Sequence, residues 1–233
     1  MQGTAKSALV TGGSSGIGLA IARVLAEEGY TLTLASRTKD KVEAAAAELG
    51  ALALEVNVAD EEACERLVAA HIERHGRLDV LVNSAGIGIG GGIEEQPLKH
   101  VDLMLGVNLR GLIAVTKYAL PHLRESRGWI VNLASIAGTE PVPELQVYAA
   151  TKAAVISLTR SLNAAHDRDG IRAIALCPGF VDTPMAAWSG IPGEEMIQPQ
   201  DCGEIVRMCL RLSPHARVPV VVVKRVGGAG GVG

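Results

Sequence analysis

The sequence predicts an α/β protein with a seven-stranded parallel sheet flanked by helices, and two observations support this prediction. Short β-branched or apolar runs alternate with segments that carry apolar residues at helical spacing, which is typical of βαβ units. The chain is 48% hydrophobic but only 3% aromatic, so Ala, Val, Leu and Ile must fill its core, as they do in buried parallel strands. The predicted strands are residues 8–11, 31–35, 52–56, 80–83, 129–133, 172–176 and 218–223.

Helices are predicted between these strands, where the sequence marks their ends. Gly29, Gly50 and Gly76 each follow a helical segment, and glycine suits the left-handed conformation that ends many helices. Asp60 is a favourable N-cap with acidic residues directly after it. Pro121 lies inside the fourth predicted helix and is expected to kink it or to end it early. The predicted helices are residues 17–28, 39–49, 60–75, 109–126 and 146–167.

The length of the chain favours one large domain. Its 233 residues lie between one and two times a usual domain length of about 150 residues. Because no repeat, charge block or Pro/Ser-rich linker divides the chain, we expect residues 1–226 to form one domain. Residues 227–233 are glycine-rich and are expected to be a flexible tail.

Charge and composition argue against several classes of partner. Lys and Arg number 22 against 25 Asp and Glu, a net charge of −3, so we expect no nucleic acid or anionic membrane as a partner. We find no run of about 18 apolar residues and no signal peptide, and we expect a cytoplasmic protein. The four cysteines lack metal-ligand spacing, so we expect buried thiols and no metal.

A glycine-rich segment, TGGSSGIG, follows the first predicted strand and opens the first helix. Glycine there allows a sharp turn and lets backbone N–H groups approach a pyrophosphate, to which the helix N-terminus is attractive. The spacing departs from GxGxxG, and a mere turn is the alternative interpretation, but strand, turn and helix in this order favour nucleotide binding. The candidate contacts are Gly12, Ser14, Ser15, Gly16, Ile17 and Gly18.

The end of the second predicted strand indicates which dinucleotide binds. An NAD enzyme would place an acidic residue there against the ribose 2′-hydroxyl, whereas this chain has Ser36 and Arg37. An arginine can pair with the 2′-phosphate of NADP and a serine can add a hydrogen bond, so NADP is predicted. An exposed loop arginine is the alternative, and Asp40 stands nearby.

Tyr148 and Lys152 are the first candidates for chemistry. Their i, i+4 spacing on a predicted helix puts the phenol and the ammonium on one face, and a fixed cation favours the phenolate. Ser135 and Asn83 each lie at the carboxyl end of a predicted strand, where ligands bind in doubly wound sheets. Asn108 is an amide in an apolar helical pattern and needs a partner, which a structural role could equally provide.

Taken together and in order, these segments resemble the short-chain dehydrogenase/reductase family. The resemblance spans nearly the whole chain, and the ordered set is far more specific than any one motif. It implies a single-domain Rossmann-like doubly wound fold. The matching segments are TGGSSGIG, NSAG, VNLRG, Ser135, YAATK and Cys177-Pro178-Gly179.

The resemblance also implies a role for each matching residue. Tyr148 would be the catalytic acid/base, and Lys152 would hold the nicotinamide ribose and lower the pKa of Tyr148. Ser135 would bind the substrate oxygen, and Asn108 would anchor a water of the proton relay. The segment of Asn83, Ala85 and Gly86 would support the sheet and contact the adenosine side. The nicotinamide would be lined by Pro178, Gly179, Val181 and Thr183.

Two departures from the family pattern affect these expectations. Asn57, followed by Val58, stands where many members have an aspartate against the adenine, and its amide oxygen can still accept a hydrogen bond. The chain after residues 218–223 also differs from the usual tail, where such a strand often makes oligomer contacts.

The reaction implied is reduction of a ketone or aldehyde by NADPH, or oxidation of the corresponding secondary alcohol, by hydride transfer. We expect the substrate wall in residues 88–93, 136–147 and 185–198, which are mostly apolar, so a compact apolar carbonyl compound is predicted. Trp188 could equally be a packing anchor, and Glu144 is expected to be exposed. The candidate substrate contacts are Ser135, Tyr148, Met185 and Trp188.

Other functions remain as alternatives. A non-catalytic NADP-binding regulatory module has no need of Ser135 and a phenol together. Epimerases and dehydratases on this scaffold usually have longer chains with a separate substrate lobe. A homodimer or homotetramer is expected, because the helices predicted at residues 109–126 and 146–167 resemble those the family uses for assembly.

Overall fold

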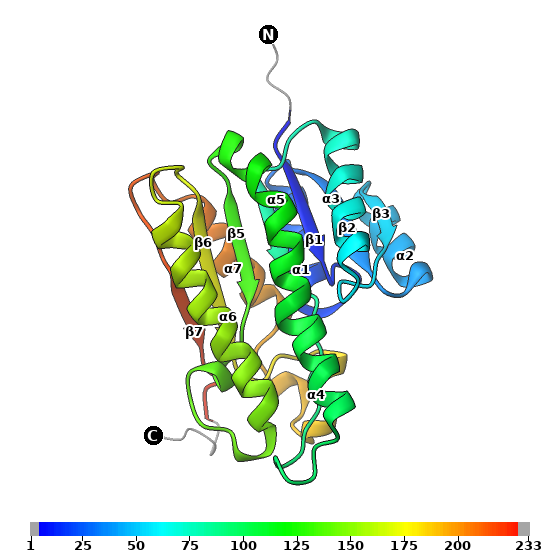
Figure 1. Ribbon diagram of the computed structural model, residues 1–233, viewed down its shortest axis with the longest axis vertical. Helices are drawn as coiled ribbons and strands as arrows, with labels where there is room; N and C mark the ends of the chain where they lie inside the picture. Colours follow the sequence, from blue (N-terminus) through cyan, green and yellow to red (C-terminus); the bar gives the residue numbers. More distant parts are fainter. Residues whose placement is uncertain (1–4, 228–233) are drawn as a thin grey trace.

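Within residues 5–227, which the computed structural model describes, seven strands form one parallel sheet in the order β3-β2-β1-β4-β5-β6-β7 (Figure 1). The chain reverses direction across the sheet between β1 and β4, so a crevice forms at their carboxyl ends. The predicted parallel α/β fold is therefore confirmed. The strands are β1 Ser7–Thr11, β2 Thr31–Ser36, β3 Leu52–Glu55, β4 Val80–Asn83, β5 Trp129–Leu133, β6 Arg172–Pro178 and β7 Val220–Val223. The helices are α1 Gly16–Glu27, α2 Lys39–Leu49, α3 Glu61–His75, α4 Leu98–Leu105, α5 Leu112–Ser126, α6 Gln146–Ala165 and α7 Pro199–Leu210.

The sheet is covered on both faces, so its central strands are buried throughout. All five residues of β1 are buried, and they alternate between two apolar cores. Ala8 and Val10 pack with residues of α1, α2 and α7, whereas Leu9 packs with residues of α3 and α5. Strands of this kind read as continuous apolar runs, which is why the sequence located them well.

The long helix that precedes β5 differs from its prediction. It runs without interruption over Leu98–Ser126, through α4, a π-helical turn at Gly106–Gly111, and α5, whereas the sequence predicted residues 109–126. Pro121 lies inside α5 and does not end it, so the expected early break is wrong. By length and composition this helix could cross a membrane, but half of its most apolar window is buried inside the fold.

Helix α7 was not among the predicted helices, and it packs closely against α1. Gly203 permits this approach, because a Cβ there would lie 2.8 Å from a methyl group of Val24. Arg207 of α7 then pairs with Glu27 and Glu28 at the end of α1. The predicted tail, residues 227–233, lies outside the described residues apart from Gly227.

Candidate active site

Two adjoining cavities lie at the carboxyl ends of the central strands. One has a volume of about 370 Å³ and is lined by Ser135, Tyr148 and Lys152, three of the four predicted catalytic residues. The other, about 320 Å³, contains the glycine turn and the end of β2. Ile17, Ser84, Gly86, Thr183 and Met185 line both, so the two cavities form one continuous cleft.

The glycine turn is shaped to let a ligand approach the backbone. Gly12 has a φ of +67°, and a Cβ there would stand 2.8 Å from the backbone nitrogen of Ala85. A Cβ on Gly18 would overlap the carbonyl oxygen of Gly12. Ser15 precedes α1 in an extended conformation without a side-chain cap, and the first turn holds no acidic residue. The amides at the start of α1 are thus suited to an anion, and the turn fits the pyrophosphate of a dinucleotide.

The end of β2 closes the far side of the cleft with polar and basic side chains. Ser36, Arg37 and Lys41 line it, and the sequence had not singled out Lys41. No acidic side chain lines this cavity within the described residues. A ligand with an extra phosphate would therefore find two cations and no opposing charge.

The adenine side differs in part from the expectation. Val58 lines the cleft as predicted, whereas Asn57 does not. The Asn57 amide oxygen accepts a hydrogen bond from the Ala59 backbone nitrogen at 3.2 Å, which forms a local turn on the surface. The proposed adenine contact of the Asn57 side chain is therefore not present in this arrangement.

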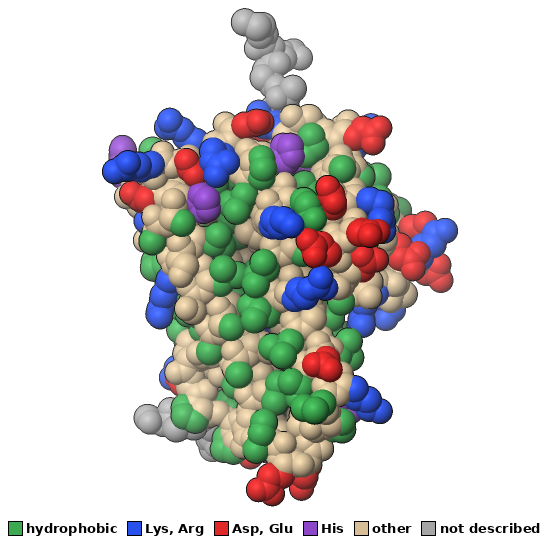
Figure 2. Space-filling view, in the orientation of Figure 1, with side chains coloured by type: hydrophobic (Ala, Val, Ile, Leu, Met, Phe, Trp, Pro, Cys, Tyr) green, Lys and Arg blue, Asp and Glu red, His purple; other side chains and the backbone are tan. Residues whose placement is uncertain are grey.

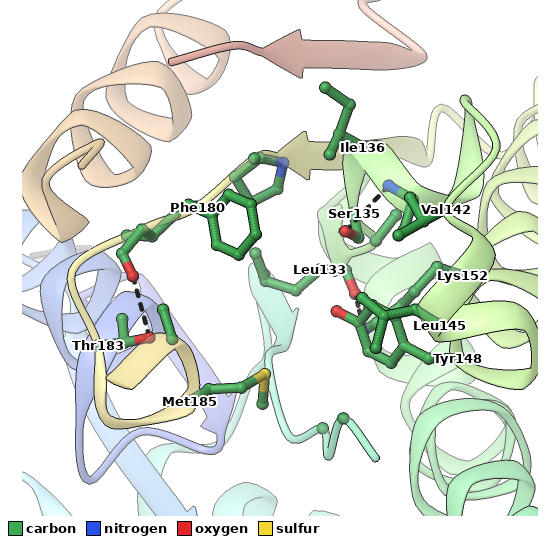
Figure 3. Close-up of a pocket in the computed structure, with 18 of the residues that line it drawn as sticks. Leu133, Ser135, Ile136, Val142, Leu145, Tyr148, Lys152, Phe180, Thr183 and Met185 are labelled. Atoms are coloured by element: carbon green, nitrogen blue, oxygen red, sulfur yellow. Dashed lines mark hydrogen bonds between the residues drawn. The ribbon is translucent and has the colours of Figure 1, made fainter. Parts of the chain in front are cut away.

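Ser135, Tyr148 and Lys152 meet at one wall of the larger cavity (Figure 3). Ser135 follows β5 and caps the next short turn, its Oγ accepting a hydrogen bond from the Ala137 backbone at 3.2 Å. Tyr148 and Lys152 come from the first turns of α6, and the Lys152 Nζ lies 5.6 Å from the centre of the Tyr148 ring. The same Nζ donates to the Leu133 carbonyl oxygen at 2.7 Å, which fixes it at the end of β5. The structure thus brings together the three side chains that the sequence placed on two separate segments.

Burial is the largest effect on the pKa values of Tyr148 and Lys152. It raises the pKa of the Tyr148 phenol, and a hydrogen bond with Ser135 acts in the opposite direction. Burial also lowers the pKa of Lys152 to about 8, an effect that nearby Cys177 partly offsets. The resemblance implied that Lys152 lowers the pKa of Tyr148, but burial prevails in this arrangement. With its pKa raised, the phenol keeps its proton at neutral pH.

Asn108 lies behind this wall, in the π-helical turn, and lines neither cavity. Its Oδ1 accepts from the Ile87 nitrogen at 2.8 Å, and its Nδ2 donates to the Ile87 oxygen at 2.9 Å and to Thr151 Oγ1 at 3.2 Å. Thr151 in turn donates to the Tyr148 carbonyl oxygen at 2.7 Å. Asn108 thus connects the loop after β4 to α6, the helix that carries Tyr148. π-Helical turns often occur at functional sites.

Asn83 does not reach the cleft, whereas Ser84, which the sequence did not single out, does. Asn83 is buried within the sheet, where its Nδ2 donates to Thr116 and to Asn132, and it lines neither cavity. Ser84, the next residue, lines both cavities. The alternation of side chains at a strand end could have indicated this, because neighbouring residues point to opposite sides.

The remaining wall of the larger cavity is apolar. Phe180, Met185 and Trp188 face it from the segment after β6, and the sequence had not identified Phe180. Glu144 is exposed as expected, yet it also lines the cavity. Figure 3 shows Phe180 and Met185 across the cavity from Ser135 and Tyr148.

Most of the predicted contacts therefore lie on the cleft. Four predicted residues line neither cavity: Gly18, Asn57, Asn83 and Asn108. Gly18 instead lets the start of α1 pack against the carbonyl oxygen of Gly12. Within residues 5–227, no group of three or more His, Cys, Asp or Glu side chains is placed to hold a metal ion. The predicted residues found on the cleft are Gly12, Ser14, Ser15, Gly16, Ile17, Ser36, Arg37, Val58, Ala85, Gly86, Ser135, Tyr148, Lys152, Pro178, Gly179, Val181, Thr183, Met185 and Trp188.

Comparison with known families gives a match over most of the chain. Residues 6–190 match the family model described as short chain dehydrogenase. An uncharacterized oxidoreductase of Staphylococcus aureus strain MRSA252 is 36% identical over 227 residues, covering 96% of this chain and 98% of the relative. One of Staphylococcus epidermidis strain ATCC 35984 is 34% identical over 224 residues, covering 95% and 97%.

Solved structures resemble the chain to a similar extent. An alcohol dehydrogenase from Thermococcus sibiricus, complexed with 5-hydroxy-NADP, has a TM-score of 0.88 and 33% identity, covering 95% of this chain and 97% of its own. A 3-ketoacyl-(acyl-carrier-protein) reductase from Brucella melitensis, complexed with NADH, has a TM-score of 0.86 and 30% identity, covering 94% and 96%.

Proposed function

This chain is an oxidoreductase that belongs to the short-chain dehydrogenase family, and we propose that it reduces a ketone or aldehyde with NADPH. The observation that carries the proposal is the position of the Tyr148 and Ser135 side chains. Both line an apolar cavity that continues into a cleft suited to a dinucleotide. The reverse reaction, oxidation of a secondary alcohol, uses the same residues.

In the proposed reaction, Ser135 and Tyr148 bind the carbonyl oxygen of the substrate. Because burial raises the pKa of Tyr148, its hydroxyl holds the proton that the oxygen needs as it becomes an alcohol. The dinucleotide, when bound, supplies the hydride that adds to the carbonyl carbon. Lys152, 5.6 Å from the ring centre, stabilises the phenolate that remains until a proton returns from solvent.

The preference for NADPH rests on the residues at the end of β2. Similar structures hold either an NADP derivative or NADH, so the assignment depends on this chain's own side chains. Arg37 and Lys41 line the cleft and could both face a 2′-phosphate, and Ser36 adds a hydroxyl. No acidic side chain is placed among the described lining residues to favour a free ribose hydroxyl.

The reaction is tested by following NADPH consumption with a panel of aldehydes, ketones and 1,2-diketones for the wild type and for Tyr148→Phe. Loss of the proton donor should lower turnover by about 10²- to 10⁴-fold. Full turnover in the variant would overturn the role of Tyr148. Binding of NADPH without turnover of any carbonyl would favour a regulatory module instead.

The cofactor preference is tested separately by measuring dissociation constants for NADPH and NADH. We expect NADPH to bind at least about tenfold more tightly, or about 1.4 kcal/mol. Arg37→Ala should remove most of this preference while leaving NADH binding unchanged. Equal constants in the wild type would contradict the assignment to Arg37.

We also propose that the chain forms a homodimer or homotetramer in the cytoplasm. Leu103, Leu105 and Ile113 of α4 and α5 are exposed, and Figure 2 shows hydrophobic side chains along the helices on this face. All four cysteines are unpaired, as in proteins of a reducing compartment. Light scattering that gives a monomer mass at micromolar concentration would overturn the oligomer, and cell fractionation checks the location.

A further inference from the structure

Three large apolar side chains are exposed beside the catalytic cavity. Trp188 is 65% exposed, Met185 46% and Phe180 39%, and all three line the cavity that contains Tyr148. Phe180 and Trp188 meet edge to face, with ring centres 6.0 Å apart and planes at 67°. An aromatic pair held in this geometry, with most of one ring in solvent, has apolar surface for a further ring to cover.

The segment that carries these side chains also contacts the catalytic wall. A Cβ on Gly88 would lie 3.6 Å from the Tyr148 ring and 3.9 Å from the Met185 sulfur, so the two side chains approach each other across this glycine. Thr183, between Phe180 and Met185, reaches the glycine turn, since a Cβ on Gly16 would stand 3.0 Å from its methyl group. The aromatic pair therefore lines the same cavity as Ser135 and Tyr148.

The charges of the cavity exclude some substrates. Among the described residues that line it, the only cation is Lys152, whose Nζ is buried and bonded to the Leu133 carbonyl oxygen. Glu144 stands on the same wall with an exposed carboxylate. A carboxylate or phosphate on the substrate would lose its hydration and gain no counter-charge.

Resting on the proposed reduction of a carbonyl, we propose that the substrate is a neutral ketone or aldehyde with a planar ring, and that Trp188 and Phe180 bind this ring. Met185 contacts the ring from the side of Tyr148, as a thioether does at the edge of an aromatic group. Short aliphatic carbonyls reach Tyr148 without covering the aromatic pair, and acidic ones are rejected.

The specificity is tested with three probes of one reaction: acetophenone, 2-butanone and 4-acetylbenzoate. For the wild type, kcat/KM for acetophenone should exceed each of the other two at least tenfold. In Trp188→Ala the ratio of acetophenone to 2-butanone should fall at least fivefold, and Phe180→Leu should lower it in the same direction. Met208→Ala is the matched control, because Met208 is 52% exposed on α7 and lines neither cavity, so its ratio should stay within twofold.

Fluorescence separates this inference from the proposed reaction. The chain has two tryptophans, and Trp129 is buried at the opposite end of the sheet, so quenching of exposed Trp188 reports on the cavity. Saturating acetophenone should quench the fluorescence of the wild type and of Tyr148→Phe, but not that of Trp188→Phe. Quenching without turnover would keep the ring site and refute the reductase. Two outcomes would refute the ring site alone while the reductase stands. One is turnover with the same ratio of kcat/KM for acetophenone and 2-butanone in the wild type and in Trp188→Ala. The other is turnover of acetophenone without quenching of Trp188.

Discussion

His71 makes the stability of this fold depend on pH. It lies in α3 beneath the amino ends of β1 and β2 and is completely buried. Its Nδ1 lies 2.9 Å from Thr33 Oγ1, and its Nε2 lies 3.1 Å from both Ser7 Oγ and the Arg77 carbonyl oxygen. Burial lowers the pKa of His71 from 6.5 to about 4, and neighbouring His75 acts in the same direction.

The sign of the effect follows from the two states. Between pH 6.5 and about 4 the unfolded chain binds a proton at His71 that the folded chain does not bind. Stability is therefore fully present above pH 6.5 and is lost as the pH falls toward 4. The pKa difference corresponds to about 3 kcal/mol of unfolding free energy when the loss is complete, and about 2 kcal/mol of this is lost by pH 5.

The assay is urea unfolding followed by circular dichroism at pH 7.5 and pH 5.0, at one protein concentration and without nucleotide. His71→Gln keeps a side chain that can donate and accept but removes the titration, so it should lose about 2 kcal/mol less than the wild type. His215→Gln, at an exposed position, should retain the wild-type dependence. The same pH dependence in the wild type and in His71→Gln would refute the reasoning.

Three further predictions test packing and positioning. Gly18→Ala forces a Cβ onto the backbone oxygen of Gly12 and should weaken NADPH binding about tenfold, or about 1.4 kcal/mol, as measured by fluorescence titration. Gly92→Ala is the control, because a Cβ there meets nothing within 4 Å, and NADPH binding should stay unchanged. Gly203→Val overpacks the contact of α7 with α1 and should lower the free energy of unfolding by about 1–3 kcal/mol in urea, a result that equal stability would contradict. Thr151→Val removes the hydroxyl between Asn108 and the Tyr148 backbone and should lower kcat about tenfold without changing NADPH affinity, with Thr151→Ser restoring it; an unchanged kcat would rule out positioning.

The sequence predicted the sheet well because each strand is short, apolar and bounded by clear turn signals. It failed on the long helix because Leu98 to Leu105 mixes exposed apolar and polar residues, three of which, Leu98, Leu103 and Leu105, are large and exposed. Tertiary contacts, and not a local sequence pattern, make such a segment helical. Pro121 misled the prediction for a related reason, since packing of α5 on the sheet outweighs one missing backbone hydrogen bond.

The candidate site was predictable where function constrains the order of residues along the chain. Ser135, Tyr148 and Lys152 could be paired because strand ends and helix starts share one edge of a parallel sheet. Phe180 could not, since it lies in the irregular segment after β6. Lys41 lies in the first turn of the predicted helix α2, but nothing in the helical pattern shows that this lysine lines the cleft. The Asn57 amide oxygen accepts a hydrogen bond from the Ala59 backbone and so is not free to accept one from an adenine. The residue type alone does not reveal which of these two partners the side chain takes.

Both edges of the sheet collect hydroxyl groups beside a basic side chain, and burial determines which edge a small molecule can reach. At the amino edge, Ser7, Thr33 and His71 bond to one another and to the backbone, and all three have 0% exposure. The Ser7 Oγ lies 3.1 Å from the His71 Nε2, but this pair belongs to a buried hydrogen-bond network that no substrate can reach. At the carboxyl edge, Ser135 and Tyr148 open onto a cavity of about 370 Å³. Chemistry follows access to the cleft, so the same residue types stabilise the fold at one edge and are placed to react at the other.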